Sequence, residues 1–153
     1  RLGYLVGPKE IIREARALRR LMLRHPPSNN QRTVAIFLAL GHHDALVARL
    51  KRAYAQRWQA LKAAFERHAE LAIGRPIRGG SSAWVEGPAW LDANALAEQA
   101  LAHKLIIEPG AIYHAQAPAP RHFYRLGFSS IDAKRIPAGI ELLARLVREQ
   151  RSC

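Results

Sequence analysis

The sequence predicts an α/β fold, in which a run of helices leads into a smaller lobe of mixed strands and helices. Apolar residues recur at helical spacing through the first 68 residues. The stretch LAIGRPIRGGSSAWVEGPAW, from residue 71 onward, instead combines glycine and proline with residues that favour strands. From there the pattern reads strand, strand, helix, strand, loop, strand, helix, which is typical of a mixed sheet covered by helices.

The chain begins at Arg1 without an initiator methionine, in a segment that is typical of a buried strand and includes Leu2, Tyr4 and Val6. We therefore expect a piece of a longer protein. After Gly7-Pro8 the pattern predicts a helix that ends near His25, because the following Pro26-Pro27 cannot continue it.

A second helix is predicted to start with Ser28 or Asn29 as its cap and to stop at Gly41. Its residues 33–40 are apolar on most sides, which is typical of a buried helix. If the chain is separated from a larger domain, the apolar faces of helices near residues 11–22 and 33–40 become exposed.

The longest predicted element runs from Asp44 to about His68, and its length suggests a helix that bridges two lobes. The elements expected after it are two strands around a Gly79-Gly80 turn, a helix capped by Asp92, a short strand at 105–107, a strand at 123–128 and a final helix from Asp132 that buries Ile136, Ile140, Leu143 and Leu146. The predicted division of the chain is 1–41, 42–70 and 71–153.

Composition excludes several classes of function. The net charge of +12 comes mostly from arginine in an alanine-rich chain, and no interleaved aromatic residues accompany the arginines of residues 13–24, so direct nucleic-acid binding there is disfavoured. The single Cys153 permits no intrachain disulfide, and no pair of histidines has the helical i, i+4 spacing of a metal site. No apolar run is long enough to span a bilayer, and a G-x-S-x-G motif and a glycine-rich phosphate loop are both missing.

Two arginines in apolar strands remain as candidates for chemistry, Arg1 in RLGYLV and Arg125 in FYRLGFSS. A guanidinium in an apolar strand is costly unless an anion pairs with it, and its planar fork binds a carboxylate or phosphate with two hydrogen bonds. An internal ion pair, or a strand-end arginine that extends to water, is the alternative for each of them.

The order of RLGYLV, HPPSNNQR, GGSSAWVEGP, IIEPG and FYRLGFSSI resembles the C-terminal part of a fold-type I pyridoxal-phosphate (PLP) protein of the aminotransferase class I family. It resembles most the aminotransferase-like domain of MocR-type regulators of the GntR superfamily, which join a winged helix-turn-helix to a PLP-binding domain. The resemblance makes residues 1–41 the end of the large PLP-binding domain, 42–70 the interdomain helix and 71–153 the small C-terminal domain.

The resemblance also assigns roles to residues. Arg1 matches the arginine that holds the cofactor phosphate, and Arg125 matches the one that pairs with the carboxylate of an amino-acid-like substrate or effector. Tyr113 and residues Ser28, Asn29 and Asn30 are expected to border the pocket. The lysine that forms the Schiff base with PLP is expected upstream of Arg1, so this chain on its own is predicted to be inactive.

Two functions stay open on this resemblance. One is the effector domain of a bacterial transcriptional regulator, cytoplasmic, dimeric, and bound to DNA through a separate N-terminal domain. The other is a genuine PLP-dependent aminotransferase that acts on an amino acid. A third reading, a basic interaction module without a cofactor, treats both arginines as structural.

Overall fold

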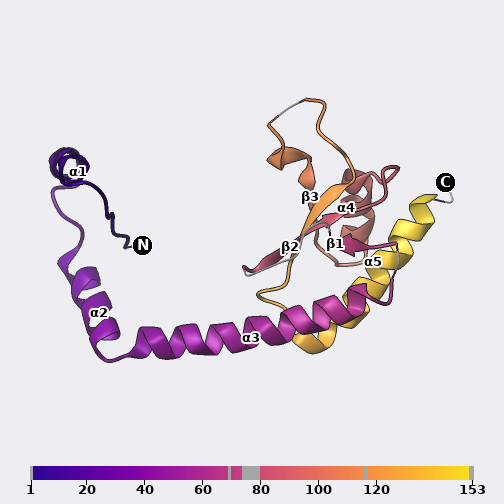
Figure 1. Ribbon diagram of the computed structural model, residues 1–153, viewed down its shortest axis with the longest axis horizontal. Helices are drawn as coiled ribbons and strands as arrows, with labels where there is room; N and C mark the ends of the chain where they lie inside the picture. The colour runs from indigo at the N-terminus through magenta and orange to yellow at the C-terminus, as the bar shows by residue number, and fades with distance from the viewer. Residues whose placement is uncertain (1, 69, 74–79, 116, 152–153) are drawn as a thin grey trace. The chain divides into compact units, whose positions relative to one another are not determined.

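The computed structural model describes residues 2–68, 70–73, 80–115 and 117–151 (Figure 1). The chain forms two compact units, Arg1–Leu50 and Lys51–Cys153, and the boundary between them falls inside the long helix α3 (His42–Phe65). The division into 1–41, 42–70 and 71–153 stays a prediction.

The first unit contains the helices α1 (Lys9–Met22) and α2 (Ser28–Ala39) and the start of α3. The strand predicted around Leu2 to Val6 is wrong, because residues 2–8 have no regular secondary structure. A strand is held by hydrogen bonds to a neighbouring strand, and the described residues of this unit include none.

Helix α2 begins differently from the prediction. Pro27 is its N-cap, with φ −54° and ψ 124°, and no side chain caps the helix, so Ser28 is the first helical residue and neither it nor Asn29 is a cap. The residues of this first turn are exposed, so water can accept from their free N–H groups in place of a side chain.

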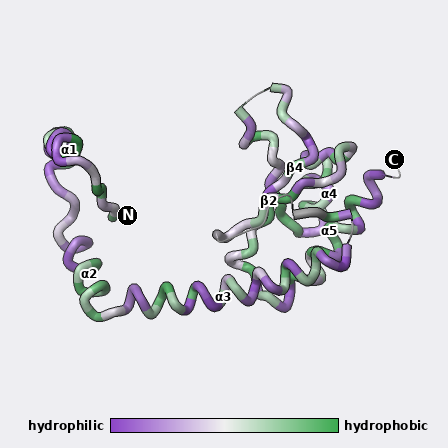
Figure 2. Tube along the Cα trace, viewed as in Figure 1, coloured by the Kyte–Doolittle hydropathy of each residue, from purple (hydrophilic) through white to green (hydrophobic). Residues whose placement is uncertain are grey.

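The prediction that α2 is buried is also wrong, since none of its residues is buried. Its hydrophobic residues are coloured green in Figure 2. No described residue of the first unit covers it, and α1 has no buried residue either. The exposed large hydrophobic side chains of the two helices are Ile11, Leu18, Leu21, Met22, Val34, Ile36, Phe37 and Leu38.

No single helix of the described chain is long and apolar enough to cross a membrane; α2 and α3 pass that test only together, as a pair bent by 71°.

The second unit is built on a four-stranded sheet in the order β1 (Ala72–Ile73), β2 (Ser82–Glu86), β4 (Phe123–Gly127) and β3 (Glu108–Pro109). Every pairing is antiparallel, which corrects the prediction of a mixed sheet. The strands β2 and β3 do run in the same direction, as a strand-helix-strand pattern suggests. The last strand, β4, lies between them, so the parallel pair is never hydrogen-bonded directly.

One face of this sheet is buried against helices. Ala83 and Val85 of β2, with Tyr124 and Leu126 of β4, belong to a single core that also includes residues of α3, α4 (Ala93–Ala102) and α5 (Ile136–Arg151). The four side chains predicted to be buried by the last helix are all buried. A short 3-10 helix, η2 (Ala133–Arg135), precedes α5 and has Asp132 as its N-cap.

The strand predicted at 105–107 is wrong, since the pairing with β4 starts at Glu108. Helix α4 ends in a hydrogen-bonded turn in which the Leu105 N–H donates to the Ala100 carbonyl over 2.9 Å and the Lys104 N–H donates to the Leu101 carbonyl over 2.9 Å. Lys104 adopts the left-handed conformation, with φ 61°. The first of these bonds uses the Leu105 N–H, which belongs to the predicted strand, to end the helix instead.

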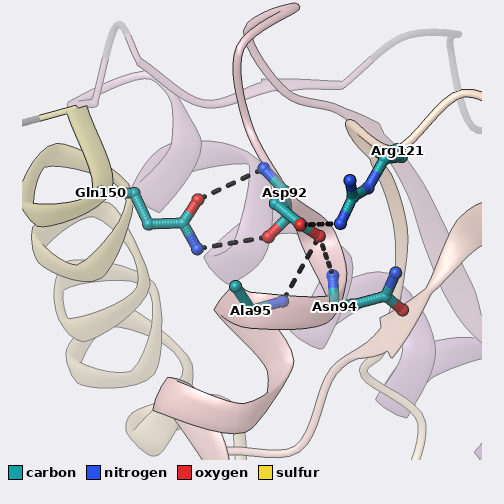
Figure 3. A network of polar contacts seen from close by, with 5 residues as sticks. All are labelled: Asp92, Asn94, Ala95, Arg121 and Gln150. Carbon is teal, nitrogen blue, oxygen red and sulfur yellow. Dashed lines mark hydrogen bonds and ion pairs between the residues drawn. The ribbon is translucent and has the colours of Figure 1, made fainter. Parts of the chain in front are cut away.

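The predicted cap of α4 is confirmed, and it ties three segments together (Figure 3). One carboxylate oxygen of Asp92 accepts from the N–H groups of Asn94 and Ala95, and the other pairs with Arg121. The Gln150 side chain of α5 exchanges two hydrogen bonds with the Asp92 backbone, at 3.3 and 3.2 Å. The start of α4, the approach to β4 and the end of α5 are thereby fixed to one residue.

Candidate functional site

The face of the sheet that points away from the core carries the candidate site. Along β2 and β4 the side chains alternate between buried and partly exposed, so Trp84, Phe123 and Arg125 share the open face. Trp84 and Arg125 are direct cross-strand partners, and Glu108 of β3 is the partner of Arg125 on its other side. The register therefore places Arg125 between an aromatic ring and a carboxylate.

Arg125, Glu108 and Tyr113 form one polar cluster. The Arg125 Nη2 donates to Glu108 Oε1 over 2.6 Å, and the Tyr113 hydroxyl donates to Glu108 Oε2 over 2.7 Å. Both carboxylate oxygens are thus engaged, one by each partner. The guanidinium carbon also lies 5.9 Å from the centre of the Tyr113 ring, within the range of a cation–π contact.

The guanidinium is not fully used by this cluster. Its Nε is buried and has no hydrogen-bond partner among the described residues, whereas the side chain as a whole keeps 41% of its surface exposed. A buried donor without an acceptor is unfavourable, and an anion that approached the Nε edge would satisfy it.

The ion pair shifts the pKa of each member. The hydrogen bond from Arg125, followed by that from Tyr113, lowers the pKa of Glu108 below its usual range. The same carboxylate raises the pKa of Arg125 and that of Tyr113, mainly through its hydrogen bonds to them. At neutral pH the cluster therefore holds one fixed positive and one fixed negative charge.

Aromatic side chains form the remainder of the open face. Trp84 stacks on Phe123 with ring centres 5.8 Å apart and an interplanar angle of 16°, and the Tyr113 ring meets Trp84 edge-on at 5.7 Å. His114 packs against Trp84 and Phe123 at 6.0 and 5.6 Å. Arg125 thus lies beside an apolar platform of aromatic rings on the open face of the sheet.

A close backbone approach fixes Glu108 opposite Arg125. Gly110 opens the 3-10 helix η1 (Gly110–Tyr113), and a Cβ at this position would lie 2.6 Å from the Phe123 carbonyl oxygen. Only glycine allows the chain to pass so close to β4. The turn after β3 therefore brings Tyr113 back over the carboxylate that β3 presents.

The structure brings together two of the predicted site residues, Arg125 and Tyr113. Ser28, Asn29 and Asn30 form the first turn of α2 in the other unit, and their place at the border of a pocket stays a prediction. Arg1 lies outside the described residues. The lysines lie on α1, on α3, at the end of α4 and in η2, and none belongs to the cluster around Arg125.

Sequence reasoning missed Glu108, although the residue stands in the IIEPG motif. A charged residue between an apolar run and a Pro-Gly turn was the available signal. Trp84 and Phe123 were also missed as site residues, and each alternates with buried neighbours along its strand. Over the described part of the chain, no group of three or more histidine, cysteine, aspartate or glutamate side chains is arranged to hold a metal ion.

No protein-family model matches the chain. The HTH-type transcriptional regulator TauR of Rhodobacter capsulatus is 46% identical over 148 residues, which cover 97% of this chain and 31% of TauR. The mitochondrial kynurenine/alpha-aminoadipate aminotransferase of Rattus norvegicus is 25% identical over 154 residues, covering 97% of this chain and 36% of the enzyme. The chain thus spans about a third of the length of the curated relatives that it matches.

The similarity to a solved structure agrees with these sequence relatives. LysN, the alpha-aminoadipate aminotransferase of Thermus thermophilus, was solved in complex with N-(5'-phosphopyridoxyl)-L-leucine, and it superposes with a TM-score of 0.81 and 27% identity. The match covers 96% of this chain and 38% of LysN. Sequence and structure therefore relate this chain to the C-terminal part of the fold-type I, PLP-dependent aminotransferase-like domains that MocR-type regulators share with aminotransferases.

Proposed function

We propose that the chain forms the ligand-carboxylate side of a PLP-binding effector domain in a bacterial HTH-type transcriptional regulator. The observation that carries the proposal is Arg125, held on the open face of a sheet with a buried Nε donor that no described residue satisfies. The similarity to TauR, at 46% identity, favours a regulator, because the aminotransferase match is only 25% identical.

In this proposal Arg125 binds the carboxylate of an amino compound. The guanidinium stays charged at all physiological pH values, and its planar fork suits a carboxylate through two parallel hydrogen bonds. The adjoining Trp84 and Phe123 rings would pack against the apolar part of the ligand. The stacked rings would pack against the ligand without selecting one particular side chain. The contact between Arg125 and the carboxylate would therefore determine most of the ligand's position.

The residues that the structure describes fit the amino-acid side of such a pocket. Bound PLP supplies a carbonyl group that reacts with amines and an electron sink for the chemistry that follows. Arg1 would hold its phosphate, as a proposal from the resemblance alone. Arg125 would be the anchor at the other end of the ligand, and its Nε, which lacks a hydrogen-bond partner among the described residues, supports this role.

Regulation would follow from a shift between two conformations of the effector domain. A ligand that binds one conformation better than the other raises its population, and a DNA-binding domain linked to the effector domain would respond. The intact protein in this proposal is a homodimer that works in the bacterial cytoplasm, and contact with DNA belongs to a winged-helix domain rather than to these residues.

The test uses the intact, PLP-loaded protein and compares L-alanine with ethylamine, which lacks the carboxylate. The change in cofactor absorbance on titration gives the dissociation constant of each. Arg125→Gln should weaken alanine binding at least about tenfold, equivalent to about 1.4 kcal/mol, and leave ethylamine binding unchanged. Arg135→Gln is the matched control, since Arg135 is exposed in η2 outside the cluster. Equal alanine affinity in Arg125→Gln and the unmodified protein overturns the proposal.

A genuine aminotransferase is the second candidate, favoured by the similarity to LysN. The two functions separate in two assays on the intact protein. A regulator shifts a labelled operator fragment in a ligand-dependent manner, and an aminotransferase passes the amino group of alanine to 2-oxoglutarate with turnover. Turnover without DNA binding assigns the enzyme.

A further inference from the structure

We propose that Glu108 sets the selectivity of Arg125 for ligand anions, by acting as a built-in competitor for the guanidinium. The inference rests on the proposed function, because it takes Arg125 as the group that receives the anion of the ligand. It assigns a specificity-determining role to Glu108, which was not among the predicted site residues.

The first step is geometric. The β3–β4 register places Glu108 directly opposite Arg125, and the Nη2–Oε1 distance of 2.6 Å is that of a short, charge-assisted hydrogen bond. A ligand carboxylate that binds Arg125 through Nη2 has to share this nitrogen with Glu108 or displace it. An anion that leaves Glu108 in place has only the N–H groups that Glu108 does not use.

The second step is electrostatic. Glu108 and Arg125 together carry no net charge, so an approaching anion is attracted by the guanidinium and repelled by the carboxylate beside it. Both side chains are about two-fifths exposed, and solvent weakens each contribution without removing it. Arg125 therefore binds an anion more weakly than it would without Glu108. Packing of the ligand against the apolar platform has to supply part of the ligand's affinity.

The third step concerns Tyr113, which holds the second oxygen of Glu108 at 2.7 Å. The hydroxyl keeps the carboxylate in the orientation that faces Arg125, because a carboxylate bonded at both oxygens cannot rotate freely. The strength of the competitor therefore depends on Tyr113 as well.

The experiment measures the carboxylate preference of the intact, PLP-loaded protein, defined as the dissociation constant of ethylamine divided by that of L-alanine. Glu108→Gln keeps the size of the side chain and removes its charge, and should raise this ratio about fivefold or more. Tyr113→Phe, which loosens the competitor and keeps its charge, should raise the ratio by a smaller factor. Glu86→Gln removes an exposed carboxylate from β2 of the same sheet and should leave the ratio unchanged.

The double variant Arg125→Gln/Glu108→Gln tests whether Glu108 acts through Arg125. If Glu108 acts through Arg125, the double variant has the same ratio as Arg125→Gln alone. A ratio that is unchanged or lowered in Glu108→Gln, while Arg125→Gln still loses alanine binding, overturns the role of Glu108 and leaves the proposed function intact. If Arg125→Gln keeps the unmodified ratio, the proposed function and this inference both fail.

Discussion

At the scale of single residues, the sequence pattern predicted that Arg125 needs an anionic partner or contact with water, but it did not predict which residue is the partner. An arginine in an apolar strand must have an anionic partner or reach water, and Arg125 has such a partner in Glu108. The sequence did not identify this partner, because the predicted strand at 105–107 left Glu108 beyond its end. Its true position depends on how α4 terminates and on the close approach of Gly110 to β4, and neither has a local sequence signal.

The ion pair predicts a pH dependence of stability. Because the pKa of Glu108 is lower in the folded chain than its ordinary 4.5, its contribution is complete above pH 4.5 and is lost as the pH falls below that value through the folded pKa. The difference in unfolding free energy between the unmodified chain and Glu108→Gln should therefore shrink as the pH is lowered from 4.5 through the folded pKa. Urea denaturation followed by circular dichroism measures it. A difference that stays constant over this range contradicts the role given to the ion pair.

At the scale of elements, the start of α4 was predicted from its capping side chain. The turn that follows the same helix depends on a backbone conformation and was not predicted. Asp92 was identified as a cap because aspartate accepts from the first free N–H groups of a helix, and the structure confirms it. The turn after α4 was not predicted, because Lys104, which adopts the left-handed conformation there, is not the glycine that usually marks such a turn. Strand order was likewise beyond the sequence, since it depends on contacts between β2 and β4 that lie about forty residues apart.

The turn at Lys104 predicts a stabilising substitution. The left-handed conformation is strained for a residue with a Cβ, so Lys104→Gly should raise the free energy of unfolding by about 1 kcal/mol or somewhat less, after the larger entropy of glycine in the unfolded chain is subtracted. Lys104→Ala keeps the Cβ and is the matched control, which should give no such gain. Thermal unfolding of the three chains decides the matter, and a loss of stability in Lys104→Gly would contradict the interpretation.

At the scale of the molecule, the two units differ in how they are held. The second unit has a continuous core, with Leu143, Leu96 and Val85 fully buried, whereas none of the described residues 2–50 is buried. Burial of apolar side chains is the main favourable contribution to folding. The hydrophobic periodicity of α1 and α2 predicted their helical state correctly, but periodicity alone does not show which surface covers an apolar face.

This difference predicts that residues 51–153 unfold cooperatively without the first fifty residues. Their melting temperature should match that of the main transition in the whole chain within a few degrees, because the core of the second unit is contained in them. The peptide 1–50 should show no cooperative transition by calorimetry. A chain 51–153 that lacks a sharp transition would show that the first unit contributes to that core.

The position of β4 has a consequence for the order of events in folding. The strand is the last of the four described strands along the chain, yet it is an inner strand that pairs with both β2 and β3. A nascent chain that ends before Phe123 therefore has β2 with an open edge and β3 with no strand beside it among the described residues. The β2–β4 and β3–β4 pairings form only after Phe123–Gly127 has been synthesised. Until then one edge of β2 lacks its partner, and an unpaired strand edge is a site that a chaperone or another copy of the chain can bind.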